Sequence, residues 1–164
     1  MRALQAKGWL THARMWFDQV ARALGLAEAN RLNRAAIRAM APFEVSRLTK
    51  VLGVAPGETI DAGAVARFVA AGITLVTPAS VAGHLRVWAE DGALRWEWDP
   101  GECFAYKGMR RFGYLAGYEC GVIYRIECWL EALGLRPLGE PAVGPCLMRD
   151  GGECAGSLEL RLGG

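Results

Sequence analysis

The sequence lacks the patterns on which most common enzyme mechanisms depend. It contains only two histidines, His12 and His84. It has no nucleophile elbow, P-loop, dinucleotide-binding fingerprint or histidine–glutamate zinc motif. The sequence therefore indicates neither a serine–histidine–aspartate hydrolase nor a nucleotide-dependent enzyme.

The sequence also has little excess charge and no long hydrophobic run. Its formal net charge of +2 is too small to indicate nucleic-acid binding. No apolar segment is long enough to span a bilayer, and the first residues lack the apolar centre of a signal peptide. We therefore expect a cytoplasmic protein that binds neither nucleic acid nor membranes.

Hydrophobic residues and cysteines, in contrast, are plentiful. The hydrophobic fraction of 52% and the length of 164 residues are enough for one core, so we expect a single domain over residues 1–164. The chain has five cysteines, an odd number. In a cytoplasmic protein these favour free thiols or metal ligands over a disulfide framework.

Apolar periodicity predicts a helical part over residues 1–60. An amphipathic helix is expected from Ala3 to Leu24, ended by Gly25 as its C-cap. Its predicted apolar stripe consists of Trp9, Ala13, Trp16, Val20 and Ala23.

Two further helices are expected before residue 80. The first runs from Ala27 to Leu52, and Pro42 should kink it or begin a new helix. The second is short, begins at Asp61 as its N-cap and ends at Ala70, because a glycine follows closely.

The stretch "GHLRVWAEDGALRWEWD" predicts a β-hairpin that turns at Asp91 and Gly92. Pairing Glu90 with Ala93 places the charged side chains on one face of the hairpin. The other face then carries Leu85, Val87, Ala89, Leu94, Trp96 and Trp98.

The last part of the chain predicts helices followed by a second hairpin. Residues 102–133 should form two helices with a break near Gly108 or Gly113. Residues 135–162 should form two strands around a turn at Asp150. Helices, hairpin, helices and hairpin in this order indicate an α+β domain, with an antiparallel sheet packed on helices.

The cysteines divide into two kinds by position. Cys120 and Cys128 are eight residues apart in a predicted helix, about 12 Å at the usual rise, so they do not share a metal ion. Cys128 is then a small buried hydrophobic residue. Cys146 and Cys154 flank the last turn, where Cys120 could join them. Free thiols, a disulfide and a metal site all remain open for these three residues.

The segment "GYLAGYECG", followed by Cys146 and by "GGEC", resembles the 4-vinyl reductase domain over residues 80–164. That family includes small-molecule-binding proteins and phenol-responsive sensor domains, and it is related in fold to the TRAPP-complex core subunits. The resemblance implies a structural zinc ion on Cys120, Cys146 and Cys154, and a homodimer. Val143 stands where the family has a glutamate. Cys103 is therefore the first candidate for a fourth ligand, and Glu140 or water is the alternative.

The stretch "GWLTHARMWFDQVARALGLAEANRLNR" is similar to uncharacterised bacterial proteins near the L-2-amino-thiazoline-4-carboxylate hydrolase family. This similarity suggests an alternative function, the hydrolysis of a small heterocyclic or amide substrate. The active group would be His12 or a water molecule bound to zinc.

The favoured function is that of a zinc-containing protein that binds or senses a small apolar or aromatic molecule, without catalysis. Six tryptophans are many for this length, and the expected pocket residues are Trp16, Trp96, Trp98 and Tyr124. A third interpretation is a dimerising module that pairs through Gly113, Gly117 and Gly121 or through Trp88.

Overall fold

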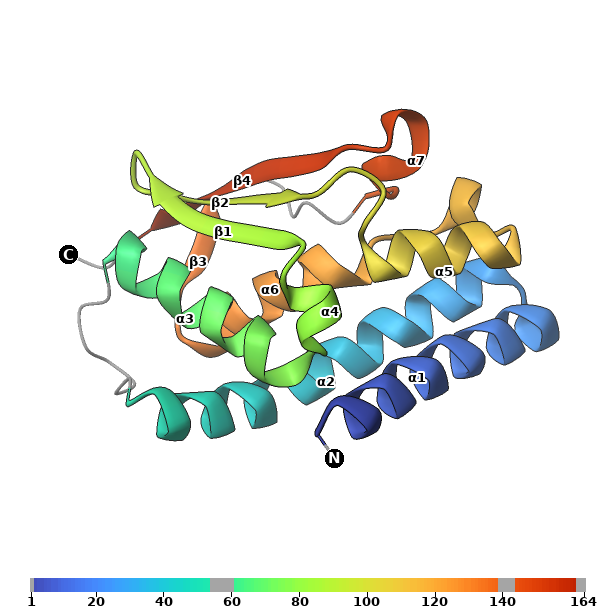
Figure 1. Ribbon diagram of the computed structural model, residues 1–164, viewed down its shortest axis with the longest axis horizontal. Coiled ribbons are helices and arrows are strands. Elements are labelled where there is room, and N and C mark those ends of the chain that lie inside the picture. The colour runs from blue at the N-terminus through green and yellow to red at the C-terminus, as the bar shows by residue number, and fades with distance from the viewer. Residues whose placement is uncertain (1, 54–60, 139–143, 162–164) are drawn as a thin grey trace.

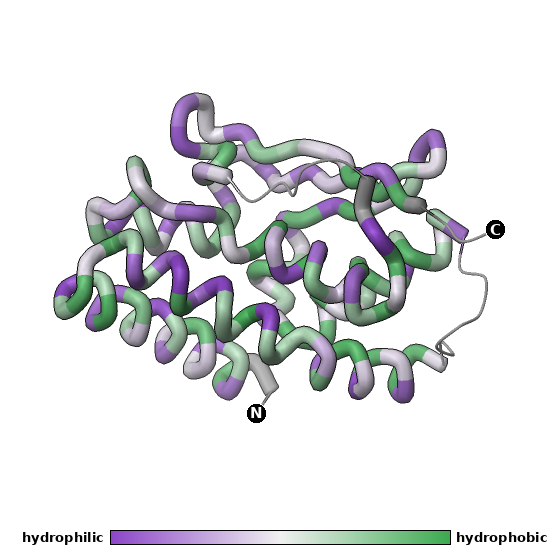
Figure 2. Tube along the Cα trace, turned by 180° about the vertical axis from the view of Figure 1, so that it is seen from behind, coloured by the Kyte–Doolittle hydropathy of each residue, from purple (hydrophilic) through white to green (hydrophobic). Residues whose placement is uncertain are grey.

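The computed structural model describes residues 2–53, 61–138 and 144–161 of the chain. Its two longest helices, α1 (Arg2–Leu24) and α2 (Leu26–Leu52), lie side by side along one edge of the molecule (Figure 1). A single residue, Gly25, connects the two helices, and its φ of 91° favours glycine. Hydrophobic and hydrophilic residues alternate along both helices (Figure 2), as the sequence predicts for amphipathic helices.

Helix α2 continues through Pro42, so the prediction that a new helix begins there is wrong. Helix α3 (Ala62–Val76) begins as predicted, because Asp61 Oδ1 accepts a hydrogen bond from the Ala64 N–H at 2.6 Å. It ends six residues later than expected. Gly72 lies inside α3 instead of ending it, and a Cβ there would be 2.9 Å from the Trp129 ring. The absence of a side chain at Gly72 therefore allows α3 to pack closely against the Trp129 ring. The short helix α4 (Ala79–Ala82) follows.

Four antiparallel strands form one sheet in the order β1-β2-β4-β3. They are β1 (Leu85–Glu90), β2 (Ala93–Trp98), β3 (Arg136–Leu138) and β4 (Cys154–Arg161). The predicted hairpin register is confirmed, with Glu90 opposite Ala93. The α+β fold is thus confirmed as well. The sheet forms one outer layer, with α3 and α6 (Gly121–Ala132) beneath it and the α1–α2 pair below them (Figure 1).

The helical segment after the hairpin breaks at Gly113, whose φ is 78°. Helix α5 (Phe104–Phe112) precedes the break, and the 3-10 helix η1 (Leu115–Gly117) and α6 follow it. The second of the two predicted positions is therefore the correct one. The break also places Cys120 at the N-cap of α6, outside the regular helix in which the sequence placed it.

The C-terminal segment differs from the expected hairpin. Residues 148–151 form a short helix, α7 (Met148–Gly151), where the sequence predicted a β-turn. Strand β3 pairs with the far end of β4, with Arg136 opposite Arg161. Residues 154–159 of β4 pair with β2. Cys146 and Cys154 therefore flank a helical turn and not the base of a two-stranded ribbon.

The glycine face proposed for dimer contacts is used inside the chain. A Cβ at Gly117 would be 2.8 Å from Leu26, and one at Gly121 would be 2.8 Å from Asn33. Both neighbours belong to α2, so these glycines allow the η1–α6 segment to pack on α2. The interpretation that these two glycines pair with a second copy is therefore wrong.

Candidate functional site

A cavity of about 350 Å³ lies between α1 and the rest of the molecule, a size typical of small-molecule pockets. Helices α2, α3, α5 and α6 and the hairpin supply its other walls. Its lining is mainly apolar and rich in aromatic rings. The aromatic members are Trp9, Trp16, Trp98, Phe104, Tyr118 and Trp129.

Two faces of α1 relate differently to this cavity. Phe17 and Ala21, on one face, are only 4% and 9% exposed. Trp9 and Trp16, in the predicted stripe, are 60% and 40% exposed. The tryptophans of the predicted stripe are therefore not packed into the core, and both border the cavity, as expected of Trp16. The face of α1 that carries Trp9 and Trp16 borders the cavity, so these two rings face a space and not a packed neighbour.

Two of the four predicted pocket residues, Trp16 and Trp98, line the cavity, and the other two lie elsewhere. Trp96 is buried against the sheet, where a Cβ on Gly156 would be 2.4 Å from its ring. Tyr124 points toward α2, and its hydroxyl accepts a hydrogen bond from Arg38 Nε at 2.9 Å. Alternation along a strand identifies buried residues but does not show which of them border a cavity.

The cavity contains one strongly charged group, Arg125, and this group is already neutralised. Its Nε donates to Glu44 Oε2 at 2.9 Å, and the Trp129 indole donates to the same oxygen at 2.8 Å. The Arg125 guanidinium also lies 5.5 Å from the centre of the Trp129 ring. This group therefore positions α2 against α6 and offers no free charge to a ligand.

The remaining polar groups are few. Burial raises the pKa of Tyr118, which stays protonated at neutral pH, and its hydroxyl accepts the Gly121 N–H at 3.1 Å. His12 stacks on Trp9 with 5.6 Å between the ring centres at the cavity mouth. The Asn33 side chain lines the cavity from α2. This composition suits a largely apolar ligand.

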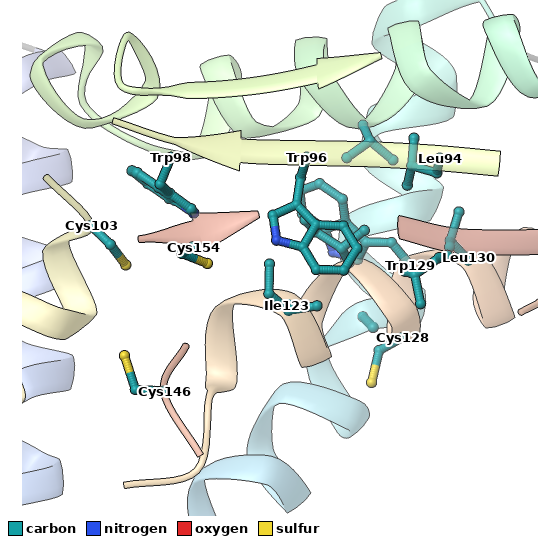
Figure 3. Packing of buried hydrophobic residues seen from close by; sticks show 14 of the residues in the cluster. Leu94, Trp96, Trp98, Cys103, Ile123, Cys128, Trp129, Leu130, Cys146 and Cys154 are labelled. Atoms are coloured by element: carbon teal, nitrogen blue, oxygen red, sulfur yellow. The ribbon is translucent and has the colours of Figure 1, made fainter. Parts of the chain in front are cut away.

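Four of the five cysteines come from segments that backbone contacts join in pairs. Cys154 lies opposite Trp98, and the Gly101 N–H donates to Gly152 O at 2.9 Å, which brings the Cys103 and Cys154 segments together. The Cys120 N–H donates to Gly144 O at 3.0 Å, beside Cys146. Figure 3 shows Cys103, Cys146 and Cys154 around one space, with Cys128 apart.

Asn30 holds the segment before Cys120 in place. Its Nδ2 donates to Gly117 O at 2.8 Å, and its Oδ1 accepts the Glu119 N–H at 3.2 Å. The residue is only 3% exposed. Sequence reasoning missed Asn30, although an asparagine within an apolar helix face is the kind of residue that bonds to distant backbone groups.

Three of these cysteines stand at the starts of helices. Cys103 is the N-cap of α5, Cys120 is the N-cap of α6, and Cys146 lies just before α7. Backbone N–H groups of the residues that follow each cysteine act on its sulfur and lower its pKa. Such N–H groups stabilise a thiolate, and therefore also a thiolate bound to a metal.

Without a metal, burial has the larger effect on these thiols. It raises the pKa of Cys103 to about 12 and that of Cys154 to about 11. Burial also raises the pKa values of Cys120 and Cys146, and the Cys146 thiol raises that of Cys120 further. The metal-free chain therefore carries four protonated thiols near one another at neutral pH, and three of these cysteines are buried.

The donor set fits zinc in its chemistry, since sulfur ligands and closed sites are typical of structural zinc. Among the described residues, however, no three His, Cys, Asp or Glu side chains are arranged closely enough to hold one metal ion. Strand β2 carries two buried indole N–H groups, those of Trp96 and Trp98, and neither has a hydrogen-bond partner among the described residues. That of Trp96 nevertheless lowers the pKa of the adjacent Cys154. A thiolate would accept such donors well.

The zinc ligand set therefore stays a prediction. Cys128 is 3% exposed and lies apart from the other four cysteines, as expected for a buried hydrophobic residue. Glu140, the alternative fourth ligand, lies outside the described residues, as does Val143.

Comparison with known proteins gives one match. The profile of a family described as "Family of unknown function (DUF6125)" matches residues 1–70, which include α1, α2 and the first part of α3. No curated protein and no solved structure matches the chain. The resemblance to the 4-vinyl reductase domain thus stays a prediction. Within the described ranges, no helix is both long and apolar enough to cross a membrane.

Proposed function

We propose that this protein binds a small apolar molecule in the cavity beneath α1, and that a zinc ion on four cysteines stabilises one wall of that cavity. The cavity itself is the observation that carries the proposal. Trp9 and Trp16 remain exposed along its mouth, whereas Trp98 and Trp129 line its inner side at 2% and 1% exposure. Aromatic walls around an unfilled space suit an apolar or aromatic ligand.

The proposed metal ligands adjoin the cavity through the chain itself. Phe104 directly follows Cys103, and Gly121 directly follows Cys120, and both of these neighbours line the cavity. When bound, zinc would supply a cross-link between four chain segments, with no open coordination position. Cys103, Cys120, Cys146 and Cys154 would then fix the starts of α5 and α6, and with them the inner wall.

The metal part of the proposal is tested by elemental mass spectrometry on protein purified without added metal. About one zinc ion per chain is expected. Metal at a thousandfold excess over its Kd stabilises by about 4 kcal/mol, so chelation should lower the Tm by about 8–16 °C. Cys146→Ser should abolish zinc binding, and Cys128→Ser should preserve it. A wild-type protein without zinc, with every thiol free to titrate, would refute the metal site.

The ligand part is tested separately with N-phenyl-1-naphthylamine, a neutral aromatic dye whose fluorescence rises in apolar surroundings. Saturable binding to one site is expected, with quenching of tryptophan emission. Trp16→Ala should weaken this binding, because it removes one wall of the cavity. Trp88→Ala, on the outer face of β1, is the matched control and should leave binding unchanged. Equal effects of the two substitutions would exclude the cavity as the binding site.

Hydrolysis is a second candidate function, because His12 lines the cavity mouth. If the protein acts on a heterocyclic or amide substrate, His12→Ala should abolish turnover and leave folding intact. Unchanged turnover in that variant would remove His12 from the mechanism.

The resemblance also implies a homodimer. Trp88 remains a candidate for the contact, since it is 37% exposed on the edge strand β1. Light scattering should then give twice the chain mass of 17.8 kDa, and Trp88→Ala should shift it toward the monomer. A wild-type monomer would refute the dimer.

A further inference from the structure

A second, smaller cavity of about 90 Å³ lies beside the first, also beneath α1. The two cavities share part of their lining, including Leu10, Asn33, Phe104 and Tyr118. Together they form a space that follows α1 from Trp9 toward Phe17. The wide part is bordered by tryptophans, and the narrow part is bordered by Arg14 and Gly108.

The Arg14 side chain lies against α5 at a position where that helix has no side chain. Gly108 lies inside that helix, and a Cβ there would be 2.8 Å from Arg14 Nε. The φ of Gly108 is not positive, so its backbone does not require glycine. Glycine destabilises a helix interior relative to alanine. What Gly108 provides in this structure is the space that the Arg14 side chain occupies.

Arg14 also differs from the other arginine that lines this space. Arg125 is paired with Glu44 through a bidentate contact. Across the described ranges, no carboxylate lies within ion-pair distance of Arg14. One end of an apolar space thus carries a positive charge that has no counter-ion among the described residues. Such a group binds an anionic group on a ligand, because a guanidinium forms strong, often bidentate bonds with oxyanions.

We infer that the ligand is an organic anion, with an apolar and preferably aromatic body in the wide cavity and a carboxylate or sulfonate bound to Arg14. This inference rests on the proposed function, since it concerns the same cavity. It makes Arg14 the specificity-determining residue and leaves the tryptophans to bind the apolar body.

Two dyes with the same aromatic skeleton separate the two contributions. 1-Anilinonaphthalene-8-sulfonate carries a sulfonate, and N-phenyl-1-naphthylamine does not. The wild-type protein should bind the sulfonate more tightly. Arg14→Gln should weaken sulfonate binding by at least about tenfold, the usual effect of losing a charge-assisted hydrogen bond. The same substitution should change binding of the neutral dye by less than about twofold.

Two further variants control this measurement. Arg47→Gln removes an exposed arginine of α2 that is likewise unpaired among the described residues, and it should affect neither dye. Gly108→Ala should displace the Arg14 side chain and reproduce the selective loss of sulfonate binding without removing any charge. Far-ultraviolet circular dichroism checks that each variant is folded.

The outcomes distinguish this inference from the proposal beneath it. If Arg14→Gln weakens both dyes equally, or neither, the anion-binding role of Arg14 is wrong although the cavity still binds apolar molecules. If the wild-type protein binds neither dye, both the inference and the proposed ligand site fail.

Discussion

Trp9 and Trp129 border the same cavity from opposite walls, yet their surroundings differ. Trp129 is 1% exposed, its indole donates to Glu44, and its ring packs on Gly72. Trp9 is 60% exposed, and its ring stacks on His12. The α6 wall is thus part of the hydrophobic core, whereas this part of the α1 wall contributes to the cavity alone. We conclude that the fold depends on the first wall, whereas the proposed ligand binding would depend on the second.

The position of each helix explains the difference. Helix α6 lies between the sheet and α2, so both of its sides are covered (Figure 1). Ile123, Ile126 and Leu130 of this helix are at most 3% exposed. Helix α1 is an outer helix that packs on α2. It is anchored near its C-terminal end, where Phe17 and Asp18 are 4% exposed.

The largest expected effect separates the two tryptophans directly. Trp129→Ala should lower the free energy of unfolding by about 3–5 kcal/mol, because it leaves a large void in the core and the Glu44 carboxylate loses a donor. Trp9→Ala should lower it by less than about 0.5 kcal/mol, as for most exposed positions. Denaturant titration measures both. Similar losses in the two variants would contradict the comparison.

A glycine pair extends the comparison to the backbone. Gly156→Ala would place a Cβ 2.4 Å from the Trp96 ring, so it should cost about 1–3 kcal/mol of stability. Gly8 lies in α1 with open space around it, and Gly8→Ala should stabilise the helix by up to about 1 kcal/mol. Thermal unfolding should therefore shift in opposite directions. A destabilising Gly8→Ala would show that the N-terminal half of α1 is packed.

The smallest expected effect concerns the anchor of α1 and appears only in acid. Arg22 lowers the pKa of the Asp18 carboxyl, and Tyr114 also donates to it at 2.9 Å. Because this pKa is lower in the folded chain than the ordinary 3.8, the contribution is present above about pH 4 and is lost as the pH falls further. The stability difference between wild type and Asp18→Asn should hence shrink below pH 4. A constant difference would exclude Asp18 as an anchor that depends on its charge.

The sequence predicted local features well where neighbouring residues determine them. The hairpin register follows from the alternation of residues 85–98 and from the Asp91–Gly92 turn, whose two positive φ angles favour these residues. The Asp61 cap and the end of α1 at Gly25 are local in the same sense. These features required no knowledge of the rest of the fold.

Features that depend on distant partners were predicted less well. The placement of β4 between β2 and β3 and the role of Gly72 depend on residues far along the chain. The stripe of α1 was recognised as apolar, but periodicity does not distinguish a face that packs from one that borders a space. The cysteine grouping could be suggested from spacing, and residues 102–133 were predicted to be helical, which places Cys103 at a helix start. The position of Cys120 at a second helix start, in contrast, depends on the break after Gly113.

The central position of β4 has a consequence for how the chain assembles. This strand comes last among the described elements, yet it supplies the only partner of β3 within the described sheet and the second partner of β2. Until it is in place, the hairpin is a two-stranded ribbon with Trp96 and Trp98 uncovered along that edge, and such ribbons are marginal by themselves. Sheet closure therefore has to join residues far apart in sequence, and pairing of this kind slows folding. A nascent or truncated chain that ends before Cys154 should accordingly expose this aromatic surface and depend on chaperones to stay in solution.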